Sequence, residues 1–198
     1  YTFAIVQDIE PFYQWLSIYQ ASEDPRSPLF DRDYSETHYH HTVYNYFIHP
    51  QWDSIGSETL YLKILFVDYE EHYAIIEFIG EWNDTLHNDI MTLKREIIDV
   101  LNAEGIRKYI LIGEHVFNFH FSDDCYYEEW FDEIAPEGWI CLINFQNHVL
   151  QELQQCGLDQ YLICGAPFDR FNWRRFSPGQ TFGNISKRYS VSLDSYAI

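Results

Sequence analysis

Residues 60–79, LYLKILFVDYEEHYAIIEFI, contain the pattern that decides the fold. The apolar run of residues 60–67 is interrupted only by Lys63, and a second largely apolar run covers residues 72–79. The residues between the two runs, DYEE, are polar and suit a turn. Two strands this close in sequence predict a β-hairpin.

A helix is expected after the hairpin, because apolar residues recur there at the spacing of one helix face. The members of this stripe are Ile90, Leu93, Ile97, Val100 and Leu101. Gly105 follows the stripe and suits a left-handed helix cap. Residues 107–112, RKYILI, end in an apolar run and predict a third strand.

Two further helix–strand pairs follow. Ser122 precedes two acids and an amphipathic run, which indicates a helix start, and Pro136 ends this second helix. Residues 139–143 are expected to form the fourth strand. A third helix, closed by Gly157, leads to a fifth strand at residues 160–164.

The predicted element order within residues 58–165 is therefore β-β-α-β-α-β-α-β. Strand–helix–strand units are right-handed crossovers, so we expect an α/β fold with a mixed sheet and helices packed on it. Residues 1–57 form an aromatic N-terminal extension, in which helical spacing predicts a short helix over residues 10–20. Residues 166–198 form a C-terminal tail that ends in an extended arm.

This order resembles that of the STAS domain, the fold of anti-sigma-factor antagonists. The most specific match is residues 144–159, NFQNHVLQELQQCGLD, which is similar to that family's late helix and the Gly-Leu-Asp before its last strand. Residues 77–82, EFIGEW, are similar to the family's second strand, which ends in a Gly and an acid. The resemblance covers about residues 59–165 and implies a STAS-like regulatory module.

The regulatory members of that family carry Asp-Ser-Ser-Gly, or a close variant, after the third strand, and its Ser or Thr is phosphorylated. The corresponding stretch here is residues 118–124, NFHFSDD, in which Ser122 is the only hydroxyl. A phosphate on Ser122 would gain from the helix dipole, but Asp123 and Asp124 would repel it. Ser122 is therefore a candidate phosphorylation site, and the alternative is a helix N-cap worth about 1 kcal/mol.

Acidic residues crowd the second helix. Residues 122–137 contain seven Asp and Glu and no Lys or Arg. Like charges four residues apart on a helix cost about 0.2–0.5 kcal/mol per pair. Either this is a solvated face, or a basic partner or the basic tail compensates the charge. The candidate partner-binding residues on this helix are Asp124, Glu128, Glu129, Asp132 and Glu133.

The tail begins with FDRFNWRRF at residues 168–176, which interleaves arginines with aromatic residues. Such a composition can stack on bases, but the negative charge of the whole chain opposes nucleic acid. A clamp onto acidic surface of this chain or of a second copy is the better hypothesis. Its candidate residues are Arg170, Trp173, Arg174 and Arg175. The aromatic residues of the N-terminal extension are expected to seal one face or edge of the sheet, with a binding surface as the alternative.

His38, His40 and His41 are weak candidates for a metal site. Alternation along an extended chain places His38 and His40 on one side, and the acids at positions 31, 33 and 36 are near in sequence. Histidines that face solvent or form hydrogen bonds are the alternative. The sequence has no metalloprotease, nucleophile-elbow, P-loop or dinucleotide motif. We therefore predict no catalytic residue and no cofactor.

Composition narrows the class of partner. The 198 residues include 12 Lys and Arg against 31 Asp and Glu, a formal net charge of -19. This balance argues against binding to nucleic acid or an anionic membrane. No uncharged apolar run is long enough for a membrane span. The four cysteines form no C-x-x-C pair, and Cys141 and Cys164 lie in apolar runs where a small buried side chain is expected, so we predict a cytoplasmic protein.

The functional prediction is a non-catalytic protein–protein interaction or regulatory module, alone or as a subunit of an assembly. Its expected partner is a protein, either a basic one or a second copy of the chain. The alternative is a metal-dependent enzyme or metal-binding protein that uses the region of His38, His40 and His41.

Overall fold

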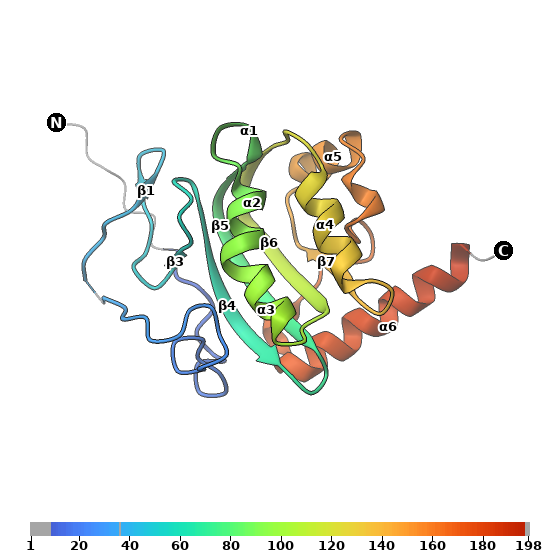
Figure 1. Ribbon diagram of the computed structural model, residues 1–198, viewed down its shortest axis with the longest axis horizontal. Coiled ribbons are helices and arrows are strands. Elements are labelled where there is room, and N and C mark those ends of the chain that lie inside the picture. Colours follow the sequence, from blue (N-terminus) through green and yellow to red (C-terminus); the bar gives the residue numbers. More distant parts are fainter. Residues whose placement is uncertain (1–8, 36, 197–198) are drawn as a thin grey trace.

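The computed structural model describes residues 9–35 and 37–196, with side chains described as far as residue 191. It shows an α/β protein with a mixed five-stranded sheet (Figure 1). The strands are β1 (Thr42–Val43), β2 (Tyr46–Phe47), β3 (Asp53–Ser54), β4 (Leu60–Asp68), β5 (Tyr73–Asn83), β6 (Lys108–His120) and β7 (Trp139–Ile143). The α-helices are α1 (Asp84–His87), α2 (Asp89–Leu93), α3 (Asp99–Ala103), α4 (Cys125–Ile134), α5 (Asn147–Gln155) and α6 (Pro178–Tyr196). A π-helical segment, Lys94–Ile98, joins α2 to α3, and Leu158–Gln160 and Trp173–Arg175 are 3-10 turns.

The strand order of the sheet is β3-β4-β5-β6-β7. The hairpin predicted from residues 60–79 is confirmed as the antiparallel pair β4–β5, in which Lys63 lies opposite Glu77. The pairs β5–β6 and β6–β7 are parallel, as their helical crossovers require. β1 and β2 form a separate two-stranded hairpin.

Helices α2–α3, α4 and α5 cover one face of the sheet (Figure 1) and enclose the larger hydrophobic core. The predicted stripe is buried at Ile90, Leu93, Ile97 and Leu101, but Val100 is 37% exposed, so that position was wrong. The π-helical segment explains the error, because its wider turn shifts the helix phase and buries Ile98 instead.

The second face of the sheet is covered by the two ends of the chain. A second hydrophobic cluster lies on this face. It joins side chains of β5, β6 and β7 to residues 12–15, residues 168–173 and α6. The ring of Phe12 lies edge-on to Trp173 at 4.7 Å, and Trp15 lies at 5.5 Å from the same indole. Phe12 and Trp15 therefore help to seal a face of the sheet, as expected for the aromatic N-terminal residues, whereas Tyr13 and Tyr44 are exposed.

The helix predicted over residues 10–20 is absent. The segment makes a single turn, in which the amides of Ile18 and Tyr19 bond the carbonyl of Trp15. Tertiary contacts override the helical spacing there, since Trp15 also donates its Nε1–H to the carbonyl of Phe176 at 3.3 Å.

Two predictions near the C-terminus are also wrong. The fifth strand is reduced to one parallel bridge between Ile163 and Cys141, because a 3-10 turn occupies residues 158–160 and turns the chain away from β7. The extended arm is instead the 19-residue helix α6. Ser177 and Gln180 cap it reciprocally, with Gln180 N donating to Ser177 Oγ and Ser177 N donating to Gln180 Oε1.

No helix in the described part of the chain is both long and apolar enough to cross a membrane.

Candidate functional site

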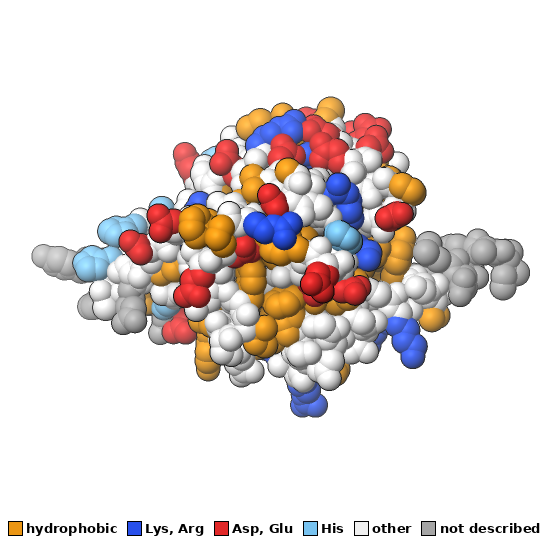
Figure 2. Space-filling view, turned by 60° about the horizontal axis from the view of Figure 1, so that its bottom comes forward, with side chains coloured by type: hydrophobic (Ala, Val, Ile, Leu, Met, Phe, Trp, Pro, Cys, Tyr) orange, Lys and Arg blue, Asp and Glu red, His pale blue; other side chains and the backbone are white. Residues whose placement is uncertain are grey.

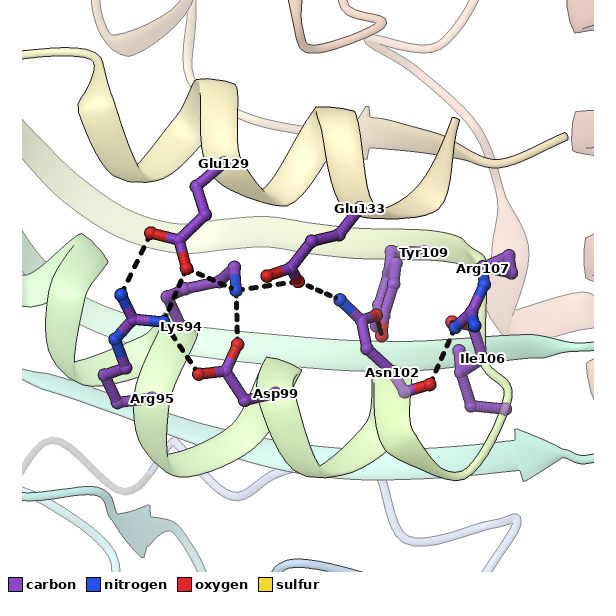
Figure 3. A network of polar contacts seen from close by, with 9 residues as sticks. All are labelled: Lys94, Arg95, Asp99, Asn102, Ile106, Arg107, Tyr109, Glu129 and Glu133. Atoms are coloured by element: carbon purple, nitrogen blue, oxygen red, sulfur yellow. Dashed lines mark hydrogen bonds and ion pairs between the residues drawn. The ribbon is translucent and has the colours of Figure 1, made fainter. Parts of the chain in front are cut away.

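The acids of α4 divide into an inner and an outer set. The inner set, Glu129 and Glu133, faces the π-helical segment, where Lys94 is completely buried (Figure 3). Lys94 Nζ lies 3.3 Å from Glu129 Oε1 and 2.8 Å from Glu133 Oε2, and it also pairs with Asp99. Arg95 adds a bidentate contact to Glu129 at 2.5 and 2.9 Å.

This network stays charged. Burial alone would lower the pKa of Lys94, but the hydrogen bonds that it donates to Asp99 and Glu133 outweigh burial and hold the pKa above its ordinary value. Asp99, Glu129 and Glu133 each place one carboxylate oxygen within 4.8 Å of the other two, close enough to bind one metal ion. The ammonium of Lys94 therefore lies where a cation would otherwise bind, and it compensates the inner acids from within the chain.

The outer acids, Asp124, Glu128 and Asp132, act on the hydroxyl of Tyr161. Tyr161 donates to Asp124 Oδ2 at 3.1 Å. Burial, the bond to Asp124 and the charges of Glu128 and Asp132 raise the pKa of Tyr161 to about 12. Among the described residues, none of these three carboxylates forms an ion pair with Lys or Arg.

A groove of about 490 Å³ lies beside these acids, along the outer edge of β7. Trp139 and Ile140 line its sheet side, and Tyr161 and Ile163 line the opposite side. Asp159 also lines it and has no Lys or Arg partner among the described side chains. The groove exists because residues 160–164 leave the edge of β7 instead of pairing along it. Asp159 is the carboxylate that lines this groove, and Asp124 is joined to it through its bond with Tyr161. We use the name acidic groove for the groove together with Asp159 and the three outer acids of α4 near Tyr161, Asp124, Glu128 and Asp132.

The arginine–aromatic tail does not reach α4. Trp173 is fully buried beneath the sheet and donates its Nε1–H to Glu114 Oε1 at 3.0 Å. Arg174 pairs with Glu114 and lies 3.6 Å from the buried Glu77. The clamp expected from the tail is therefore present for these two residues, on acids of β5 and β6 and not on the acidic helix. Arg170 and Arg175 are exposed.

Ser122 is exposed and lies between β6 and α4. The N-cap of α4 is Asp124, and Asp123 Oδ1 accepts a bond from the amide of Cys125 at 3.1 Å. The N-cap expectation for Ser122 was therefore wrong. The physical reason is the length of β6, which extends to His120 beside Asn83 of β5 and leaves the helix to begin later than the sequence indicates.

The three histidines lie in the N-terminal extension, and histidine side chains gather toward the left end of the view in Figure 2. His38 and His40 are exposed and stack at 6.0 Å, whereas His41 lies 5.3 Å from the ring of Tyr61. Within the described residues, the only cluster of three or more metal-type ligands is Asp99, Glu129 and Glu133, which includes no histidine. Glu36 lies outside the described residues.

Lys94 and Glu77 are among the buried charged residues that the sequence did not reveal. Lys94 was overlooked because the π-helical turn rotates it inward from a position that an α-helix would expose. Glu77 is 1% exposed, and its Oε2 accepts the amide of Phe12 at 2.8 Å. Its place inside the strand run EFIGE was the available signal, since a charged residue in a buried strand needs a partner.

Comparison with known proteins gives no family assignment. The sequence matches no family model and no curated protein.

Proposed function

We propose that this chain is a non-catalytic interaction module that binds a positively charged segment of a partner protein in the acidic groove. The observation that carries the proposal is the division of the α4 acids. Glu129 and Glu133 have internal cations, whereas Asp124, Glu128 and Asp132 have none and gather beside a groove.

Electrostatics supports a basic partner. The groove carboxylates repel one another and remain near water, so a Lys or Arg brought among them relieves repulsion without a large desolvation cost. The net charge of -19 adds long-range attraction for a cationic partner and speeds its association at low salt. Acidic side chains are spread across the face in Figure 2, with hydrophobic side chains between them. Binding should therefore weaken as ionic strength rises.

A STAS-like arrangement remains part of the proposal. The hairpin followed by parallel strands and helices on one face supports it, and the loss of the last strand departs from the expected order. A cytoplasmic location is also proposed, supported by four free cysteines of which Cys141 is fully buried. Phosphorylation of Ser122 stays a prediction that mass spectrometry of the native protein can check. A metal at His38, His40 and His41 stays a prediction for elemental analysis.

Charge reversal in the acidic groove tests the proposed function. We expect the double variant Glu128→Lys with Asp132→Lys to lose at least tenfold in affinity for a Lys-containing peptide, measured by calorimetry at 50 mM and 300 mM salt. The matched control reverses two exposed acids elsewhere, Glu58→Lys with Glu70→Lys, which changes the net charge equally. Equal losses in both variants would show that only bulk charge acts and would contradict the proposal.

A further inference from the structure

The free edge of β7 gives the acidic groove a binding mode. We propose that the partner segment binds as an added β-strand along β7, with Lys or Arg at alternate positions and apolar side chains between them. This rests on the proposed function, because it specifies how the basic segment occupies the same groove.

The edge of β7 is only partly paired in the described structure. Ile163 donates its amide to the carbonyl of Ile140 at 2.8 Å and accepts from the amide of Leu142 at 2.8 Å. Toward the start of the strand, the groove replaces this pairing and is lined by Gly138, Trp139 and Ile140.

The strand presents backbone groups to that groove. The amide of Trp139 bonds the carbonyl of Arg107, on the side of β6. Successive residues of a strand direct their backbone groups to opposite sides, so the N–H of Ile140 points to the same side as its carbonyl, toward the groove. The carbonyl of Ile140 is already bonded to Ile163, so the groups that face the open part of the groove are the N–H of Ile140 and the carbonyl of Gly138. Such an edge is a template for another strand.

The walls of the groove predict the side-chain pattern of that strand. Trp139 and Phe131 offer apolar surface, Asp159 supplies a carboxylate of the lining, and Tyr161 of the lining bonds Asp124. We call this acidic side of the groove its rim. Side chains of an extended segment alternate between two faces. Apolar residues would therefore face the groove walls, and Lys or Arg residues would face the rim.

The basic segments of this chain do not fit the same place. Residues 173–175 form a 3-10 turn with Trp173 buried and Arg174 paired to Glu114, so they are not free to extend. A second copy would also bring its own charge of -19. The occupant is therefore a basic extended segment of a different protein.

The test uses the full chain, isotopically labelled, and two acetylated and amidated hexapeptides of equal composition. One alternates Lys and Val, and the other places three Lys before three Val. We expect the alternating peptide to bind at least tenfold more tightly and to slow hydrogen exchange at the Ile140 amide at least tenfold. Two further versions of that peptide carry N-methyl groups on the odd-numbered or on the even-numbered backbone nitrogens. One version should fail to bind, and the other should bind as well as the unmethylated peptide.

Each other outcome has a definite meaning. If both peptides bind equally, Ile140 exchange does not change and Glu128→Lys still weakens binding, strand addition is overturned while the proposed function stands. If neither peptide binds at low salt, both proposals are overturned. If the Ile140 amide becomes protected with rising protein concentration and no peptide, a second copy is the occupant and this inference is overturned.

Discussion

Replacing Lys94 by Met should destabilise the protein by removing the cation that joins α4 to the π-helical segment. The Lys94 side chain is 0% exposed, and its carboxylate partners Asp99, Glu129 and Glu133 are 33%, 35% and 40% exposed. Breaking a fully buried pair costs about 3–5 kcal/mol, and partial exposure of these acids reduces the expected loss to about 2–3 kcal/mol. For a chain of this size the melting temperature should fall by about 4–12 °C.

The loss should depend on pH. Burial would raise the pKa of Asp99, but Lys94 and Arg95 hold it below its ordinary value, and Arg95 with Lys94 does the same for Glu129. An acid with a lowered pKa in the folded state contributes stability above its unfolded pKa and loses it as the pH falls through the folded value. The difference between wild type and Lys94→Met should therefore be full above about pH 5 and shrink below about pH 4.

Urea unfolding at a series of pH values measures this difference. The control is Lys187→Met, an exposed lysine on α6, which should change stability by less than about 0.5 kcal/mol. In Lys94→Met, the remaining oxygen cluster should accept Ca²⁺, so millimolar Ca²⁺ should raise the melting temperature of the variant and not of the wild type. A variant as stable as wild type at pH 7, or an equal Ca²⁺ effect on both proteins, would refute the reasoning.

Three further variants test other parts of the fold. Burial, with a smaller contribution from the charge of Glu114, raises the pKa of Glu77 to about 7 despite the Phe12 amide and Arg174. The folded state therefore holds this proton more tightly than the unfolded chain, and wild-type stability should fall by about 3 kcal/mol as the pH rises from about 4.5 to 7. Urea titrations should show that Glu77→Gln lacks this fall. Trp173→Ala should lower the free energy of unfolding by about 3–5 kcal/mol in calorimetry, because it leaves a cavity where the tail packs against the sheet. Ser177→Ala should cost about 1 kcal/mol and speed hydrogen exchange in the first turn of α6, and normal exchange there would contradict the capping role.

The sequence predicts the central sheet well, because its signals are periodic and local. The hairpin of β4 and β5, the strands β6 and β7 and the helices α4 and α5 all follow from runs of apolar residues with turn residues between them. Gly105 and Gly157 have the expected positive φ of 94° and 75°, so the helix ends were also readable.

The ends of the chain were less predictable, because their structure depends on the face of the sheet that they cover. Among the α6 side chains that the structure describes, Phe182, Ile185 and Tyr189 belong to the second cluster, and the glycines at 179 and 183 weaken the helical pattern. The capping pair Ser177 and Gln180, with Pro178 between them, was the local signal that could have identified this helix.

The candidate site was predictable in composition and not in arrangement. Asp124, Glu128 and Asp132 were identified from charge density alone, and the sequence grouped them with Glu129 and Glu133. Only the packing of α4 against Lys94 separates the two sets.

The ion pairs of the described residues leave the acidic groove without a cation, because each of them joins a Lys or Arg to an acid outside it. Lys63 and Arg32 pair with the buried Asp53, and Arg26 pairs with Glu104. The remaining ion pairs of Lys and Arg in the described structure are those of Lys94, Arg95 and Arg174. Among these acids, the buried Asp53 would be costly without its cations. The groove carboxylates lie near water, where an unpaired charge costs little, so the fold can leave them free and their local concentration becomes a recognition feature.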